Sequence, residues 1–220
     1  MSPIKSTLRV IILAGIQIAE FVGFILFLHL FPDFKTKFTA YNYVGFVLLG
    51  LAYPLTVSFV SSVKLYGTFP INTILLIINA ALLGAGFGLL MYINSLAWTC
   101  GFLAGDFVFV CIFLAVGSRI KFFNTTLVYI LTVLLAIAVF AISVIAATKK
   151  IPWIDDKAVC ASIFVLSVLL LLIEGHNMST EEHTYALAAL LIFVTYVIIY
   201  YATCLIKLKY LPERPSFVAN

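Results

Sequence analysis

Charged residues are scarce in this chain. Asp, Glu, Lys and Arg together make up 10% of its 220 residues, whereas hydrophobic residues make up 64% and the mean hydropathy is +1.20. A soluble domain carries about 25% charged residues because its surface must face water. The composition therefore excludes a soluble globular protein and predicts an integral membrane protein whose surface is covered by the lipid bilayer.

Sequence signatures of enzymes and of metal or cofactor sites are also absent. The chain has no HExxH motif, no GxSxG motif and no glycine-rich phosphate loop. Its three histidines (His29, His176 and His183) form no metal-ligand set, and its four cysteines lie singly in apolar runs. We therefore expect no enzymatic activity, no cofactor and no bound metal. The basic residues stand singly or in pairs at the ends of apolar runs, which is typical of membrane-interface anchors and not of nucleic-acid binding.

Seven apolar runs fill almost the whole chain. A helix needs about 20 apolar residues to cross a bilayer, and short connections place consecutive helices side by side and antiparallel. The sequence therefore predicts an all-α polytopic integral membrane protein, a seven-transmembrane-helix bundle that forms one membrane domain over residues 1–220. The expected spans are about 8–31, 42–63, 70–92, 96–116, 125–147, 157–174 and 183–206.

Ionisable residues inside these spans are the strongest functional signal, since a charge at the centre of a bilayer costs at least about 2.5–3.5 kcal/mol. Asp106 lies near the middle of the fourth span, with no cation within a helical turn. Glu20 lies in the first span, and Glu174 closes the sixth beside Gly175. These three carboxyls are the candidates for an ion path or for proton sensing. The alternatives are a protonated, hydrogen-bonded carboxyl at Asp106 and a solvated helix end at Glu174.

Small residues cluster in the third span. Gly84 and Gly88 stand one helical turn apart, close to Ala80 and Ala81. In a membrane, such spacing lets a neighbouring helix approach closely. We interpret Gly84 and Gly88 as helix-packing residues.

Four short motifs follow one another between residues 10 and 207. They are Leu13–Gln17 in the first span, Phe69–Asn72 at the start of the third, Ser118–Phe122 after the fourth and Ser179–Ala186 before the seventh. The first is similar to an apolar-Gln step and the second to a Pro-x-Asn opening. The third is similar to a Thr-Arg-Tyr-Asp-Phe loop and the fourth to a Ser-Pro-Glu-Glu-Tyr-Val-Phe-Ala segment. In this order the motifs resemble the Bax inhibitor family, and within it the lifeguard branch.

The chain departs from that family at its paired aspartates. Members usually carry one aspartate in the sixth span and one in the seventh, a pair proposed to gate a calcium leak by sharing a proton. Here the seventh-span position falls on or near Phe193. The sixth-span position falls near Leu169, or on Glu174 if the loop is shortened differently. Lys121 also replaces the loop aspartate, so the chain resembles a divergent member, such as one of the virus-encoded relatives.

The resemblance implies a calcium-permeable leak channel of intracellular membranes that modulates calcium content and apoptosis. The endoplasmic reticulum or the Golgi is the expected location, and the plasma membrane is the alternative. Calcium prefers oxygen ligands, so the carboxylates of Asp106, Glu20 and Glu174 suit calcium as the permeant ion.

A second hypothesis is a non-conducting membrane protein. It would regulate cell death or receptors by binding the spans of apoptosis-regulating or receptor membrane proteins. The missing aspartate pair and the aromatic-rich spans favour this alternative. A small transporter or receptor ranks last, because only the number of spans supports it and the sequence contains no visible inverted repeat.

Overall fold

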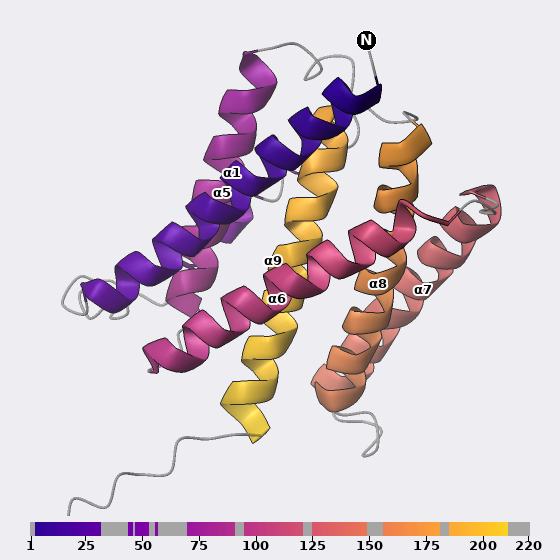
Figure 1. Cartoon of the computed structure of the whole chain (residues 1–220). Helices are drawn as coiled ribbons and strands as arrows, with labels where there is room; N and C mark the ends of the chain where they lie inside the picture. Colours follow the sequence, from indigo (N-terminus) through magenta and orange to yellow (C-terminus); the bar gives the residue numbers. More distant parts are fainter. Residues whose placement is uncertain are drawn as a thin grey trace, which may run out of the picture.

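The computed structural model describes residues 3–31, 44–45, 47–52, 56, 70–90, 95–120, 125–148, 156–180 and 185–210. Within these residues the chain is helical apart from short turns and helix ends, and Figure 1 shows the long helices as a bundle. These helices are α1 (Pro3–Leu30), α5 (Ile71–Leu90), α6 (Leu96–Gly117), α7 (Thr125–Thr148), α8 (Asp156–Thr180) and α9 (Tyr185–Tyr210).

Five of the described helices are long and apolar enough to cross a membrane. Their spans are Thr7–Leu30, Ile71–Leu89, Leu96–Gly117, Lys157–Met178 and Ala186–Lys207. They coincide with five of the expected spans, so the prediction of an all-α membrane protein is confirmed. The described residues do not reach seven spans. Of α7 the described apolar stretch is Ile130–Ile142, and the expected span 42–63 lies mostly outside the described residues, so neither is among the five.

Helix α9 forms the centre of the bundle. It packs against α1, α5, α6 and α8, and 61% of its span is buried, against at most 39% in each of the other four spans. In Figure 1, α9 runs between the α1–α5 pair and the α7–α8 pair, and α1 and α6 cross in front of it. The sequence of α9 suits this position because its polar Thr195 and Thr203 hydroxyls donate to carbonyls of their own helix.

Helices α1 and α6 each bury one face. The buried positions of α1 recur every three or four residues, as expected for one side of a helix. They are Val10, Ala14, Gln17, Ile18, Phe21, Ile25 and Leu28. The opposite side of α1 is also apolar, with Leu8, Ile12 and Ile16 exposed. An apolar face that no described helix covers is typical of contact with lipid.

The aromatic ring of Phe21 anchors α1 on the central helix. It meets three rings of α9 edge-on, with centroid distances of 6.1 Å to Phe193, 5.9 Å to Tyr196 and 5.6 Å to Tyr200. Edge-to-face packing of this kind is the favoured geometry for buried aromatic pairs. All four side chains are almost completely buried, so they form the most densely aromatic part of the core.

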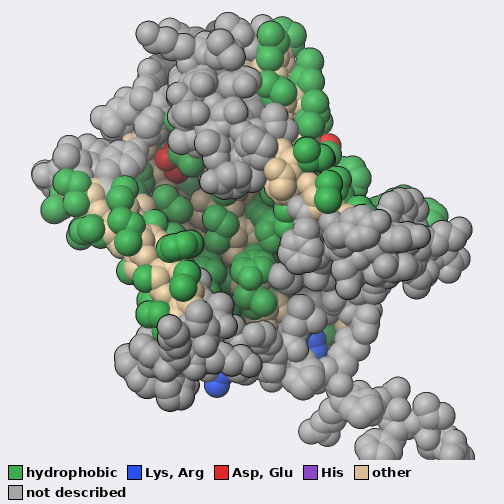
Figure 2. Space-filling model, turned by 180° about the vertical axis from the view of Figure 1, so that it is seen from behind, with side chains coloured by type: hydrophobic (Ala, Val, Ile, Leu, Met, Phe, Trp, Pro, Cys, Tyr) green, Lys and Arg blue, Asp and Glu red, His purple; other side chains and the backbone are tan. Residues whose placement is uncertain are grey.

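The outer surface of the described residues is mainly hydrophobic. Helix α7 packs mainly on α8 and exposes large apolar side chains over most of its length. These are Leu127, Ile130, Leu131, Val133, Leu134, Ile137, Phe140 and Val144. Figure 2 shows the same character on the back of the molecule, where the coloured side chains are mostly hydrophobic and Lys or Arg atoms appear only near the lower edge. Such a surface is compatible with a bilayer and not with water.

Contacts between α1 and α5 fix their relative direction. Gln17 Nε2 of α1 donates to the Leu76 carbonyl of α5 at 3.5 Å. Further along both helices, Gly88 of α5 lies against Leu28 of α1. Residue numbers therefore rise together in the two helices, which run side by side in the same direction.

Helices α6 and α8 run opposite to α1, α5 and α9. Thr7 at the start of α1 donates to the Met178 carbonyl near the end of α8 at 3.2 Å. Cys160 near the start of α8 donates to the Ala202 carbonyl near the end of α9 at 3.6 Å. Gly117, at the end of α6, meets the backbone of α8 near the end of that helix. The starts of α1, α5 and α9 and the ends of α6 and α8 therefore lie at one end of the bundle, called here the Thr7 end.

Two predictions about the helices differ from the structure. The sixth span was expected to end at Glu174, but α8 continues to Thr180, and its polar Glu174 and Asn177 are buried. Consecutive helices were expected to be neighbours, which holds for α7 with α8 and for α8 with α9, whereas α6 packs mainly on α8 and α9 and not on α5 or α7. Short connections limit how far apart two helix ends lie, but they do not decide which helix faces pack.

Candidate functional site

Asp106 lies on the buried face of α6. The buried residues of this helix, Thr99, Leu103, Asp106, Val110 and Gly117, recur at helical spacing, so the carboxyl faces the bundle and not lipid. Asp106 is 5% exposed. Thr203 of α9 donates its hydroxyl to Asp106 Oδ2 at 3.0 Å. A carboxyl halfway along a membrane helix thus has a neutral hydrogen-bond donor as its partner.

Polar and aromatic groups of α9 surround this contact. Tyr196 donates its hydroxyl to the Leu103 carbonyl at 3.1 Å, one turn before Asp106. The side chains of Tyr200 and Cys204 also lie near Asp106. Tyr196, Tyr200 and Cys204 are at most 1% exposed. The surroundings of Asp106 are therefore closed to lipid but contain several hydroxyl and thiol groups.

The Thr203 hydroxyl has one proton and three acceptors within reach. These are Asp106 Oδ2 at 3.0 Å, the Ile199 carbonyl at 3.2 Å and the Tyr200 carbonyl at 2.9 Å. The hydroxyl can donate to a carboxylate, or it can donate to its own helix and accept a hydrogen bond from a neutral carboxyl. The pair can therefore satisfy Asp106 in both protonation states, with only a rotation of the Thr203 hydroxyl between them.

Glu174 lies inside α8 and not at its end. It is 3% exposed, which contradicts the interpretation of this residue as a solvated helix terminus. The Asn177 side chain hydrogen-bonds to the Glu174 carboxyl one turn later. Its other oxygen, Oε2, is enclosed and has no hydrogen-bond partner among the described residues. A buried carboxyl oxygen in this state has unused capacity to accept a hydrogen bond or to contact a cation.

Glu20 occupies a less enclosed position in α1. The residue is half-buried, and its Oε2 atom is enclosed without a hydrogen-bond partner in the described part of the chain. Gln17 lies one turn earlier and is fully buried against α5, where it donates to Leu76. The contact between α1 and α5 thus contains polar groups on a helix pair otherwise held by apolar packing.

The structure does not gather the three candidate carboxyls into one cluster. Gly175, the neighbour of Glu174, packs against Leu114 of α6, which is about 12 Å along the helix axis from Asp106. Among the described residues no group of three His, Cys, Asp or Glu side chains is placed to hold a metal ion. Two of the histidines make hydrogen bonds at helix ends instead: His29 with the Thr99 hydroxyl and His176 with the Ile120 carbonyl, both at 3.0 Å.

The glycines singled out in the third span lie where α5 meets α1. A Cβ atom added to Gly84 would lie 3.1 Å from Phe21 Cα, and one added to Gly88 would lie 2.7 Å from Leu28 Cδ1. A second pair, Gly117 and Gly175, permits an even closer approach between α6 and α8. Sequence analysis missed this pair because the two glycines stand in different spans, with no repeated spacing within either one.

The positions that the resemblance assigns to the aspartate pair are apolar in the structure. Phe193 is completely buried and packs against Phe21. Leu169 is half-buried on α8. No protein-family model matches the chain, and no similar protein was found among curated proteins or solved structures.

Proposed function

We propose that this protein is a divergent, Bax-inhibitor-like membrane protein with seven spans that forms a calcium-permeable leak channel. The observation that carries the proposal is Asp106, a carboxyl halfway along a membrane helix, turned into the bundle and hydrogen-bonded to Thr203 of the central helix. A buried ionisable residue in a membrane span costs stability, which is the usual reason to assign it a function. The endoplasmic reticulum or the Golgi is the proposed location.

The direction of the helices supports the count of seven spans. Helices α1 and α5 run in the same direction side by side, so the chain between Leu30 and Ile71 has to return to the side of the membrane from which α1 started. A membrane crossing within the expected span 42–63 provides this return. With α7 as a further span, all seven helices alternate in direction.

The chemistry of a leak would use carboxyl oxygens inside the bundle. Asp106 and Glu174 are both buried, and one oxygen of Glu174 has no hydrogen-bond partner among the described residues. Calcium takes oxygen ligands and needs several of them, so a passing ion would keep part of its water and meet the two carboxyls in succession. Release of the Thr203 hydroxyl from Asp106 to its own helix backbone would free the carboxylate for the ion.

Calcium uptake by liposomes that contain the purified protein tests the proposal. Removing one negative charge from a low-dielectric path changes the energy of a cation by several kcal/mol, so Asp106→Asn should lower the initial rate by roughly tenfold or more. Asparagine retains an oxygen that accepts from Thr203, which preserves the packing. Glu20→Gln makes the same chemical change at the half-buried candidate of α1, so it tests the contribution of Glu20 separately from that of Asp106. Equal rates for folded wild-type protein and Asp106→Asn would refute the role of Asp106.

A non-conducting, partner-binding protein is the second candidate. The observation that favours it is the separation of the three carboxyls, which leaves no three-residue ligand group in the described part of the chain. Its partners would be the membrane spans of apoptosis-regulating or receptor proteins. Absence of calcium uptake by folded wild-type protein, together with direct binding of a purified partner span, would support this candidate over the channel.

A further inference from the structure

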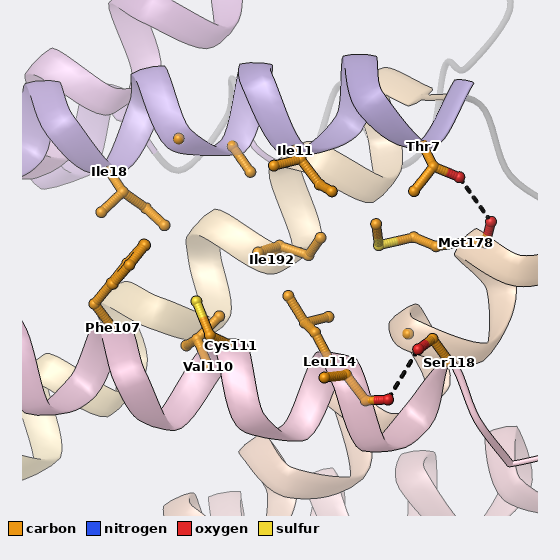
Figure 3. A pocket seen from close by; sticks show the side chains of 14 residues that line it. Thr7, Ile11, Ile18, Phe107, Val110, Cys111, Leu114, Ser118, Met178 and Ile192 are labelled. Atoms are coloured by element: carbon orange, nitrogen blue, oxygen red, sulfur yellow. Dashed lines mark hydrogen bonds between the residues drawn. The ribbon is translucent and has the colours of Figure 1, made fainter. Parts of the chain in front are cut away.

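A pocket of about 440 Å³ separates α1 from α6 on the front of the bundle. Figure 3 shows α1 along one wall and α6 along the other, with Ile192 of α9 at the back between them and Met178 of α8 at one end. The two walls contact each other little, because both helices pack on α9 instead. The pocket is therefore a groove that the helices leave open.

The groove is apolar along most of its length and polar at one end. Its lining is hydrophobic from Ile18 and Phe107 to Leu114. The Thr7 and Ser118 hydroxyls lie at the other end, where Thr7 donates to the Met178 carbonyl at 3.2 Å and Ser118 donates to its own helix at 2.8 Å. This polar end coincides with the Thr7 end of the bundle.

The length of the groove matches one leaflet of a bilayer. It extends from Thr7 to Ile18 on α1 and from Ser118 to Phe107 on α6, and eleven residues of helix cover about 16 Å. The hydrocarbon core of a bilayer is about 30 Å thick, so this distance is about half of it. Ile18 and Phe107 also lie near the middle of their membrane spans, Thr7–Leu30 and Leu96–Gly117. The groove therefore runs from one membrane interface to the midplane.

The open side of the groove faces the surroundings at the depth of the hydrocarbon core. Ile11 of α1 is 55% exposed, and Phe107 and Cys111 of α6 are also exposed. In a bilayer such an opening meets lipid chains and not water. Arg119, next to Ser118, is exposed beyond the polar end, where the phosphate of a phospholipid would lie.

We propose that the groove between α1 and α6 binds one acyl chain of a phospholipid from the leaflet at the Thr7 end. Its length, its apolar walls and its polar outer end fit an acyl chain whose headgroup stays at the interface. A transmembrane partner helix would instead need an apolar surface that continues through both leaflets. This inference does not depend on whether the protein conducts ions.

Two open glycines of α1 give a matched pair of variants. A Cβ atom added to Gly15 or to Gly23 meets nothing within 4 Å, so a side chain can be introduced at both positions without a collision at its Cβ atom. Gly15 lines the groove, whereas Gly23 does not. Gly15→Phe therefore fills the groove, and Gly23→Phe adds the same ring to α1 outside it. Ala115→Phe fills the groove from the opposite wall.

The experiment is photocrosslinking in liposomes of phosphatidylcholine that carries a diazirine at the end of one acyl chain, followed by mass spectrometry of the labelled peptides. In the wild-type protein, label should concentrate on the deep end of the groove, at Ile18, Phe107 and Val110. Gly15→Phe and Ala115→Phe should each reduce that label several-fold, whereas Gly23→Phe should leave it unchanged.

Three results would overturn the proposal. Label spread evenly over the exposed Val108 and Ile112, or a pattern that Gly15→Phe and Ala115→Phe do not alter, would show that lipid only surrounds the protein. The third result would identify a second copy of the chain as the occupant of the groove. It is a disulfide-linked dimer through Cys111, the remaining exposed thiol, when a Cys100→Ser variant is oxidised in liposomes.

Discussion

Among the contacts at glycines, the backbones approach most closely where α6 and α8 cross, at Gly117 and Gly175. This crossing gives the sharpest stability prediction. A Cβ atom on Gly175 would collide with the Leu114 carbonyl oxygen and would lie 3.0 Å from Ser118 N and 3.1 Å from Gly117 Cα. All three are backbone atoms of α6 or of the turn that follows it. They cannot move aside as the end of a side chain can, so Gly175→Ala must push the two helices apart.

The expected cost follows from two opposing terms. Forcing an additional carbon into a well-packed contact costs about 1–3 kcal/mol, whereas alanine gains roughly 1 kcal/mol over glycine in a helix. Gly101 of α6 provides the control, because a Cβ atom there meets nothing within 4 Å. Gly101→Ala has the same gain in helix propensity, but its added Cβ atom causes no collision. Gly175→Ala should therefore be less stable than Gly101→Ala by about 1–3 kcal/mol.

Unfolding of both variants in mixed micelles, with increasing sodium dodecyl sulfate and far-ultraviolet circular dichroism as the signal, measures this difference. Gly117→Ala should behave as Gly175→Ala does, since a Cβ atom there would collide with the Leu172 carbonyl oxygen. The double variant should cost less than the sum of the two, because one separation of the helices relieves both collisions. Identical unfolding midpoints for Gly175→Ala and Gly101→Ala would refute the close crossing.

Three further predictions concern the core, the membrane and the topology. Phe21→Ala should destabilise the protein by about 3–5 kcal/mol, because it leaves a cavity among three rings of α9; an unchanged unfolding midpoint would contradict this. Cys111 is exposed but lies within a membrane span, so a water-soluble maleimide should label it in detergent and not in intact liposomes; labelling in liposomes would place α6 outside the bilayer. Tags at Met1 and Asn220 should be accessible from opposite sides of the membrane, because the proposed seven spans would place the ends on opposite sides; access from one side would exclude an odd number of spans.

The sequence predicts the membrane helices well because long apolar runs leave few alternatives. The expected span 8–31 corresponds to Thr7–Leu30, and 96–116 corresponds to Leu96–Gly117. The prediction fails at the end of the sixth span, where Glu174, His176 and Asn177 give the sequence the polarity of a loop. In the structure Glu174 and Asn177 are buried, and His176 contacts the Ile120 carbonyl at 3.0 Å. Polarity ends a span only where the side chains reach water, and tertiary contacts decide this.

The candidate site, like the helices, could be predicted from the sequence only in part. Asp106 is recognisable from sequence, since a carboxyl without a nearby cation in the middle of an apolar run has few structural explanations. Its partner Thr203 is not recognisable, because threonines are common in membrane helices and this one is almost a hundred residues away. The spacing of Thr99, Asp106 and Gly117 does contain a usable signal. These small or polar residues share one helical face, and that face is the buried one.

The buried face of α6 also explains why this helix does not pack mainly on the helices next to it in the sequence. Gly117 removes the side chain that would hold α8 at the usual distance, and Gly175 does the same from the other helix. The backbones therefore meet near the Thr7 end, while Asp106 further along the face remains free to contact α9. Glu174 directly precedes Gly175 on α8, so this buried carboxyl lies one residue from the crossing. If the two carboxyls act in succession, Gly175→Ala should impair both stability and calcium flux, whereas Gly101→Ala should alter neither by more than the propensity term.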